Sequence, residues 1–427
     1  MATAEGMLTM KLLLFLGSGV SSGCGLPNTQ EISCALFRDG IGSTLPRFGV
    51  INRHTRHIPK RQALLRILRE HAIRYGRSSR SDNAHSHTDR ITYEMLFYLS
   101  QQLANQLNEE ADNPAIGGFV EEILEQAKNQ KLPGQYQHPF EGESEAEYSQ
   151  YLREQDPPTM GILAEETCNY IQWVVWHELN RTVPLEELER KLALVLDLAR
   201  SDEIDQLDIC TLNHDLLLET LFDSKGIQYI DGFGPPDGNI RFFKPAVYDE
   251  KTTKGIHRIR IFKLHGSINW RFFQCCASAD SRPAIHMVGQ QNSSEYCDAL
   301  GRIWQPLEHQ HLLLAGTGNK TDAYNRQRVF VEMWHRFHHV LEEHDRIVMS
   351  GYGWGDIPVN DKLRGWIDAN SKKNKLFLLH RCFDHTALFP ADSYVWEVID
   401  KRLVVIKKWL SDVCTLEDLL REIGGST

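Results

Sequence analysis

The chain has 427 residues, of which 41% are hydrophobic and 24% are charged. This is the composition of a globular protein with ample material for a large core, and it excludes an intrinsically disordered class. The formal net charge of -10 argues against a surface built as a whole to bind nucleic acid or acidic membranes.

The first predicted element is a strand at Leu12 to Leu16, a continuous apolar run that ends at a glycine-rich segment. Its length and unbroken hydrophobicity are typical of a buried strand of a parallel sheet. Lys11 and this run also resemble a short secretory or lipoprotein signal, but one lysine and so short a run are less than such a signal requires. No other stretch approaches the length of a membrane span, so we expect a cytoplasmic protein with no membrane partner.

A long block of helical patterns follows, from about Pro59 to Arg200. Apolar residues at helical spacing predict helices at 61–74, 93–107, 119–127, 163–179 and 185–198. Two polar, turn-rich stretches within the block, 78–89 and 131–147, predict loops. The block therefore predicts a large α-helical insertion, which we place at 51–204.

The insertion begins with a conspicuously basic stretch, Arg47 to Arg90, which has many arginines and few acids. Such a stretch is typical of a solvated helix face, and contact with nucleic acid or an acidic partner is the alternative. Because no aromatic stacking platform accompanies it, the solvated face is favoured. Nucleic acid is therefore not predicted as a partner.

Strand patterns return after the insertion. They lie at 207–211, 258–264, 345–350, 375–379 and 403–406, and helical patterns at 216–222, 328–342 and 416–423 fall between or after them. Strands that alternate with helices predict a doubly wound parallel sheet. The predicted fold is therefore α/β, with a Rossmann-like sheet formed by 1–50 and 205–427 around the helical insertion.

The first predicted strand is followed by Gly17-Ser18-Gly19-Val20-Ser21 and then by Gly25-Leu26-Pro27. Glycines at this point let the backbone approach a pyrophosphate, and the N–H groups of the next helix can face its phosphates. The alternative for a lone pair of glycines is a tight strand-to-helix turn without a ligand. The extension through Ser21 to Pro27 makes the nucleotide-binding interpretation more specific.

Polar residues also follow two later predicted strands. Asn213 and Asp215 lie just after the strand at 207–211, and His265 follows the strand at 258–264. Ligands of open parallel sheets bind beyond the carboxyl ends of the strands, so Asn213 and Asp215 are placed to reach a ribose or nicotinamide. The alternative is that they cap the next helix. His265 can act as a general base in this position, although structural or exposed histidines are more common.

The last motif follows the strand at 345–350 and runs to Asp356 and Asn360. Its small residues, which include Gly351 and Gly353, would let the backbone line the adenosine half of a dinucleotide. The alternative is a loop whose Asp356 caps a helix.

These four motifs, in this order, resemble those of the sirtuin superfamily. The nucleotide loop of that family has the form G-A-G-x-S-x-x-x-G-I-P, from which this chain departs at Ser18 and Leu26. Sirtuins carry T-Q-N-I-D, and their shorter NAD-hydrolysing relatives T-x-N-Y-D, where this chain has 211–215. Residues 263–267 have the form of the sirtuin-like catalytic histidine motif, and 351–356 are similar to a late G-Y-S-x-x-D nucleotide-binding segment.

The resemblance implies that the chain binds NAD, and it assigns roles to individual residues. Asn213 and His265 would be catalytic, with Asn213 positioning the ribose or the attacking water and His265 accepting a proton. The residues that it assigns to cofactor binding are Gly17, Ser18, Gly19, Ser21, Gly25, Pro27, Asp215, Gly351, Tyr352, Gly353 and Asp356.

The zinc module of the sirtuin deacylases is missing from this sequence. The chain has 9 cysteines, and no two of them form a C-x-x-C pair, so we expect reduced thiols, no zinc and no other metal ligands. The Phe-Arg pair that follows G-I-P in the family is also absent, because Asn28 to Gln30 occupies those positions. Both departures favour hydrolysis of NAD over protein deacylation.

The nearest resemblance is to short prokaryotic sirtuin-like NAD hydrolases of antiviral defence, which deplete cellular NAD when they are triggered. It implies an NAD+ glycohydrolase, with a separate sensor or ATPase subunit as the kind of partner that restrains it. We also expect a homo-oligomer, because a large helical insertion offers contact surface. The alternatives are an NAD-dependent protein deacylase or ADP-ribosyltransferase, and a catalytically silent NAD-sensing interaction module.

Overall fold

The computed structural model of the chain describes fourteen segments in all. They are residues 10–39, 58–78, 91–108, 116–132, 159–250, 258–276, 284–288, 296–313, 328–369, 373–382, 402–412, 416–417, 419 and 421. The contacts divide the chain into two compact units, the first formed by 1–28, 179–314 and 320–427 and the second by 29–178 and 315–319.

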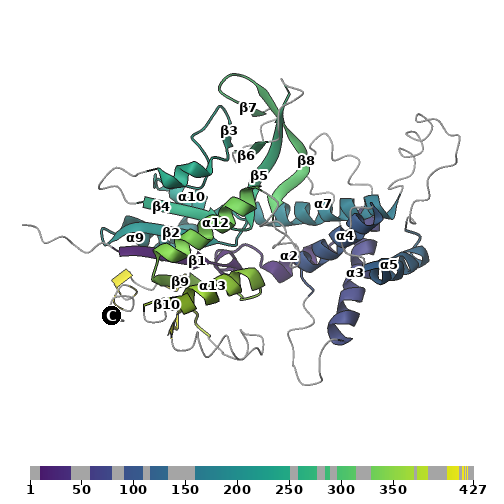
Figure 1. Ribbon diagram of the computed structural model, residues 1–427, viewed down its shortest axis with the longest axis horizontal. Coiled ribbons are helices and arrows are strands. Elements are labelled where there is room, and N and C mark those ends of the chain that lie inside the picture. Colours follow the sequence, from purple (N-terminus) through teal and green to yellow (C-terminus); the bar gives the residue numbers. More distant parts are fainter. Residues whose placement is uncertain are drawn as a thin grey trace, which may run out of the picture. The chain divides into compact units, whose positions relative to one another are not determined.

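The described part of the first unit contains a six-stranded sheet whose neighbouring strands all pair in parallel (Figure 1). In spatial order its strands are β11 (Leu403–Ile406), β10 (Lys375–Leu379), β9 (Arg346–Ser350), β1 (Met10–Leu16), β2 (Ile204–Thr211) and β4 (Arg258–Lys263). Taken from β4 and numbered along the chain, this is the order 3-2-1-4-5-6 of the doubly wound dinucleotide-binding fold. The predicted Rossmann-like parallel sheet is confirmed.

The central strand β1 explains why its sequence is a continuous apolar run. It is flanked by β2 and β9, and its residues from Leu12 to Leu16 are at most 1% exposed. A strand that is covered on both faces and both edges has no position at which a polar side chain reaches water. Phe15 packs with Phe337 and Tyr352 in a large hydrophobic cluster.

Helices of the first unit connect and cover the strands. They are α1 (Ser18–Gly23), α8 (Leu185–Lys191), α9 (Ala193–Arg200), α10 (Leu217–Ser224), α12 (Arg328–Glu343), α13 (Ile357–Ala369) and the short 3₁₀ helix η4 (Pro245–Asp249). The apolar stripes of α12 and α13 contribute Phe330, Met333, Val359 and Leu363 to the same cluster as the sheet. Apolar residues recur at a period of about 3.6 in these two helices because one face of each helix is buried in this cluster.

A second, antiparallel sheet in this unit was not predicted. Its strands, in spatial order, are β3 (Ile240–Phe242), β6 (Ala284–Val288), β5 (Gly266–Cys275), β8 (Ile303–Leu313) and β7 (Tyr296–Cys297). It has a small core of its own around Phe273 and Trp304. These strands mix apolar residues with polar and charged ones, so they lack the continuous apolar run that identified β1.

The second unit is helical in its described part, with α2 (Thr29–Ala35), α3 (Ile58–Ser78), α4 (Tyr93–Leu107), α5 (Gly117–Asn129) and most of α7 (Met160–Leu179). The first four predicted helices of the insertion fall on α3, α4, α5 and α7. The edges of the unit differ from the predicted 51–204, because α2 packs on α4 while α9 packs on β2.

Helix α3 is the described part of the basic stretch. Arg66, Arg69 and Arg74 are exposed on it, whereas Arg61 is buried and pairs with Glu166 at 2.9 Å. The rest of that stretch, most of the two predicted loops, and parts of the predicted C-terminal helix at 416–423 lie outside the described residues.

Across the described residues, we find no helix that combines the length and the apolar character needed to cross a membrane.

Candidate active site

Four loops of the first unit lie at the carboxyl edge of the parallel sheet. They follow β1 at Gly17, β2 at Asn213, β4 at His265 and β9 at Gly351. In a sheet of this topology the strand order reverses between β1 and β9, and connections leave to opposite faces there. The sequence motifs therefore converge on the edge where such sheets bind ligands.

The loops after β1 and β9 are locked together through their backbones. The N–H of Gly17 donates to the Ser350 carbonyl at 3.0 Å, and the N–H of Gly19 donates to the Gly351 carbonyl at 2.9 Å. A Cβ on Gly17 would lie 2.5 Å from the Gly351 carbonyl oxygen, and one on Gly351 would lie 2.5 Å from the Val20 nitrogen. The close approach of two loops thus accounts for these glycines, whether or not a pyrophosphate also requires them.

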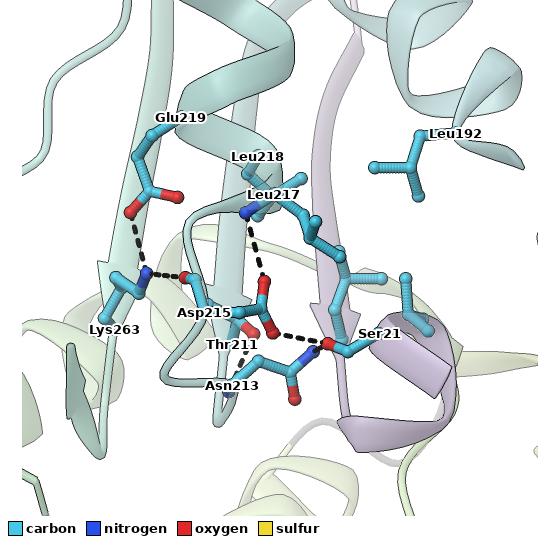
Figure 2. Close-up of a pocket in the computed structure, with 11 residues that line it drawn as sticks. Ser21, Leu192, Thr211, Asn213, Asp215, Leu217, Leu218, Glu219 and Lys263 are labelled. Atoms are coloured by element: carbon cyan, nitrogen blue, oxygen red, sulfur yellow. Dashed lines mark hydrogen bonds and ion pairs between the residues drawn. The ribbon is translucent and has the colours of Figure 1, made fainter. Parts of the chain in front are cut away.

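Ser21 joins the loop after β1 to the loop after β2 (Figure 2). Its hydroxyl donates to Asp215 Oδ2 at 2.5 Å and accepts from Asn213 Nδ2 at 2.8 Å. The same Asn213 nitrogen donates to the Gly17 carbonyl at 3.0 Å. Both amide protons of half-buried Asn213 are therefore engaged, and its oxygen is turned away from Ser21.

Asp215 also holds the start of the following helix. Its Oδ1 accepts from the N–H of Leu217, the first residue of α10, at 3.1 Å. One oxygen of this carboxylate therefore accepts from the start of α10, and the other oxygen faces Ser21. Because both oxygens have partners, Asp215 is fixed as a structural anchor of the loop that carries Asn213.

A buried ion pair, which the sequence motifs did not indicate, supports this loop from β4. Lys263, which is 3% exposed, donates to the main-chain oxygen of Asp215 and to Glu219 Oε1, the latter at 2.7 Å (Figure 2). Burial raises the pKa of Glu219, and the facing ammonium of Lys263 acts in the opposite direction. The sequence signal that could have pointed to such a pair was a lysine in a strand expected to be buried.

His265 pairs with Asp356, which comes from the loop after β9. The two atoms His265 Nε2 and Asp356 Oδ2 are 3.0 Å apart, and the side chains are only 4% and 3% exposed. The other oxygen of Asp356 accepts from the Val359 N–H at 3.0 Å, at the start of α13. The ring of His214 lies 6.2 Å from that of His265, centroid to centroid.

Tyr352 is buried beneath the loop after β9. Its hydroxyl donates to Asn360 Oδ1 at 2.7 Å and to the Asp356 carbonyl at 3.2 Å. Asn360 in turn donates to the Trp354 carbonyl at 2.9 Å, and Trp354 adopts a positive φ of 56°. Tyr352 therefore shapes the loop from within.

A small cavity lies next to Ser21, Asn213 and Asp215 (Figure 2). It measures about 10 Å³, which is about the room of one water molecule. The residues that line it are Leu16, Val20, Ser21, Leu192, Thr211, Asn213, Asp215, Leu217, Leu218, Glu219 and Lys263. His265 and Asp356 do not line it, and neither do Ser18, Gly25, Pro27 and Gly353, so the structure brings together only part of the predicted set.

One group within the described residues has carboxylate and imidazole atoms close enough to hold a metal ion: Asp208, Glu343 and His344. Arg260 already occupies it, with contacts of 2.5 Å to each oxygen of Asp208 and 2.7 Å to Glu343. Because the guanidinium of Arg260 donates to both carboxylates, it occupies the position that a metal cation would take, and we assign no metal site there.

The cysteines of the described residues are free thiols. Burial raises the pKa of Cys24, just beyond the glycine loop, to about 12, and the nearby Asp215 acts in the same direction. This thiol is protonated at neutral pH and is not a nucleophile for the site.

No protein-family model matches the chain, and a search of curated proteins found no match either. The resemblance to sirtuins therefore stays a prediction that rests on the four motifs.

Proposed function

We propose that the chain is an NAD+ glycohydrolase that cleaves NAD+ to nicotinamide and ADP-ribose. The observation that carries this proposal is the convergence of four motifs at one edge of a 3-2-1-4-5-6 sheet, after β1, β2, β4 and β9. Sheets with this order bind dinucleotides across the crevice where the order reverses. The motifs there include an amide, Asn213, and an imidazole, His265.

The reaction breaks the bond between the ribose anomeric carbon and the nicotinamide nitrogen, and nicotinamide leaves with the electron pair. The ribosyl centre becomes oxocarbenium-like, as it does in glycoside hydrolysis, and water adds to it with loss of a proton. Asn213 suits the task of holding the ribose or the water, because Ser21 and Gly17 fix its amide. His265 would accept the proton, a role that commonly contributes about 10²–10⁴-fold.

The closed geometry of the site makes activity depend on opening. The side chain of His265 is only 4% exposed. We therefore expect the loop that carries it to move before NAD+ reaches both Asn213 and His265. Such a requirement fits the triggered NAD+ depletion in antiphage defence that the resemblance implies, and we include that role in the proposal.

The same closure favours a second candidate, an NAD-sensing module that binds the dinucleotide without turnover. The hydrolase and the sensing module would use the same edge of the sheet, so affinity for NAD+ does not distinguish them. Release of nicotinamide does distinguish them, because only the hydrolase produces it.

The test is incubation of the purified chain with NAD+ while nicotinamide and ADP-ribose are followed by chromatography. We expect release by the wild type and at least about a 100-fold lower rate in H265A and N213A. H339A is the matched control, because the side chain of His339 is 67% exposed and lies on α12, outside the four motifs.

Full turnover in H265A would contradict the proposal. Modified protein in place of free ADP-ribose would favour the deacylase or transferase, and tight NAD+ binding without release would favour the sensing module.

A further inference from the structure

Two carbonyls of the loop that carries Asn213 are held from the end of β4 and the start of β5. The His214 carbonyl accepts from the Ile268 N–H at 2.9 Å, which is a contact between two main chains. The Asp215 carbonyl accepts from the ammonium of Lys263, the last residue of β4. The second contact therefore depends on the identity of one side chain, and a substitution can remove it.

The ammonium of Lys263 is buried together with a carboxylate. The side chain of Lys263 is 3% exposed, that of Glu219 on α10 is 9% exposed, and Nζ lies 2.7 Å from Oε1 (Figure 2). Removing two such charges from water has a cost that their attraction often does not repay, and apolar side chains of similar volume commonly replace such a pair without loss of stability. Stability alone therefore does not explain a lysine at this position.

The position of Asp215 bears directly on Asn213. The Ser21 hydroxyl donates to Asp215 Oδ2 at 2.5 Å and accepts from Asn213 Nδ2 at 2.8 Å. A shift of the Asp215 main chain would move its carboxylate, the Ser21 hydroxyl would follow, and the Asn213 amide would lose its fixed acceptor. Lys263, Asp215, Ser21 and Asn213 all line the same small cavity (Figure 2). The ammonium thus acts on the Asn213 amide through Asp215 and Ser21.

We propose that Lys263 is a positioning residue for Asn213, which holds the Asp215 carbonyl so that the Asn213 amide keeps one orientation toward the ribose or the attacking water. This inference rests on the proposed function. Lys263 acts through its neighbours and is not itself a catalytic residue. Glu219 compensates the charge of the ammonium, which makes its burial possible.

Three variants separate positioning from stability. K263M leaves Glu219 buried without its cation, so it should unfold at a clearly lower temperature. K263M/E219M removes both charges and should regain much of that loss, but it has no donor for the Asp215 carbonyl. E219Q takes the counter-charge from Lys263 yet leaves this donor in place. K225M is the matched control, since Lys225 follows α10 and pairs with Glu189 at 2.6 Å with its side chain 26% exposed.

Two readouts on the full chain test the inference, beside thermal unfolding. The kcat for nicotinamide release should be about tenfold or more lower in K263M/E219M, should fall less in E219Q, and should stay at the wild-type value in K225M. Spectra of protein with ¹⁵N-labelled asparagine, with Asn213 assigned by its loss in N213A, should show one pair of amide signals for Asn213 in the wild type and in K225M. In K263M/E219M these signals should shift or broaden.

A K263M/E219M protein with wild-type kcat and wild-type Asn213 signals would overturn the inference. A loss of kcat in E219Q as large as in the double variant would do the same, because the charge and not the carbonyl contact would then be responsible. If K263M/E219M does not fold, K263M/E219Q provides the same comparison. Absence of nicotinamide release by the wild type would instead count against the proposed function, and the Asn213 signals would still decide whether Lys263 positions the amide.

Discussion

Among the single residues of the site, Ser21 fixes the orientation of the Asn213 amide. Because Asp215 accepts hydrogen bonds and does not donate them, the Ser21 proton points to Asp215, and its lone pair receives the Asn213 N–H. The Ser21 hydroxyl therefore links the segment after β1 to the Asn213 side chain after β2 and fixes the orientation of that side chain. A serine is suited to this because it donates and accepts at the same time.

We predict that S21A lowers nicotinamide release by about tenfold or more. The substitution leaves a buried carboxylate oxygen without its donor, at a cost of about 1–3 kcal/mol, and frees the Asn213 amide to rotate. S22A is the control, since Ser22 lies on the same short helix α1 and is only partly buried. Steady-state kinetics and thermal unfolding of both variants check this, and equal kcat in S21A and S22A would contradict it.

The sequence identified Ser21, Asn213, Asp215 and His265 as residues of interest through their motifs, and the structure joins the first three by hydrogen bonds. The sequence did not identify Asp356 as the partner of His265, because the two residues lie in loops far apart in the chain. The ion pair between Lys263 and Glu219 was missed because its two residues also come from separate elements. A sequence motif gives the residue types in one segment. Which side chains of two distant segments meet depends on the register of the strands that carry them.

At the scale of elements, the carboxyl edge depends on the close contact of the loops after β1 and β9. Gly351 has a φ of +68°, which side chains rarely tolerate, and a Cβ there would meet the backbone of the other loop. The backbone cannot swing aside as a flexible side chain would. Loop contact of this kind keeps the four motifs in one place.

We predict that G351A is clearly destabilising while G353A is nearly neutral. The positive φ alone costs about 1–2 kcal/mol for alanine, and the 2.5 Å approach to the Val20 nitrogen adds to it. Gly353 lies in the same loop, and a Cβ there meets nothing within 4 Å. Denaturant unfolding of both variants measures the difference, and equal stability of the two would show that the loops are not locked.

At the scale of the whole molecule, the parallel sheet was predictable and the rest of the architecture less so. Strands buried on both faces leave short apolar runs, which identified β1, β9 and β10, and shorter strand patterns also placed β2, β4 and β11. The strands of the second sheet were not predicted, since they mix apolar residues with polar and charged ones. The limits of the helical unit also shifted, because long-range packing of α2 and α9 sets them.

Stability should also depend on pH through His344, which is buried beside Asp208 at 3.4 Å. Burial lowers the pKa of His344 from its ordinary 6.5, although Asp208 acts in the opposite direction. The unfolded chain therefore binds a proton near pH 6.5 while the folded protein keeps this imidazole neutral. The free energy of unfolding should fall as pH is lowered through this value, until the folded-state pKa is reached.

H344Q should flatten that part of the stability profile, whereas H339Q, at a histidine whose side chain is 67% exposed, should leave it unchanged. Denaturant unfolding between pH 5 and 8 tests this over the range in which a histidine titrates. A wild-type slope that persists in H344Q would assign the dependence to other groups.

A crystal structure of the full chain with a non-hydrolysable carbocyclic NAD+ analogue would show whether NAD+ binds across the carboxyl ends of β1 and β9. We expect the analogue to span this edge, with its nicotinamide end beside Asn213 and His265. An analogue bound elsewhere, or bound here with its adenosine end at Asn213, would contradict it.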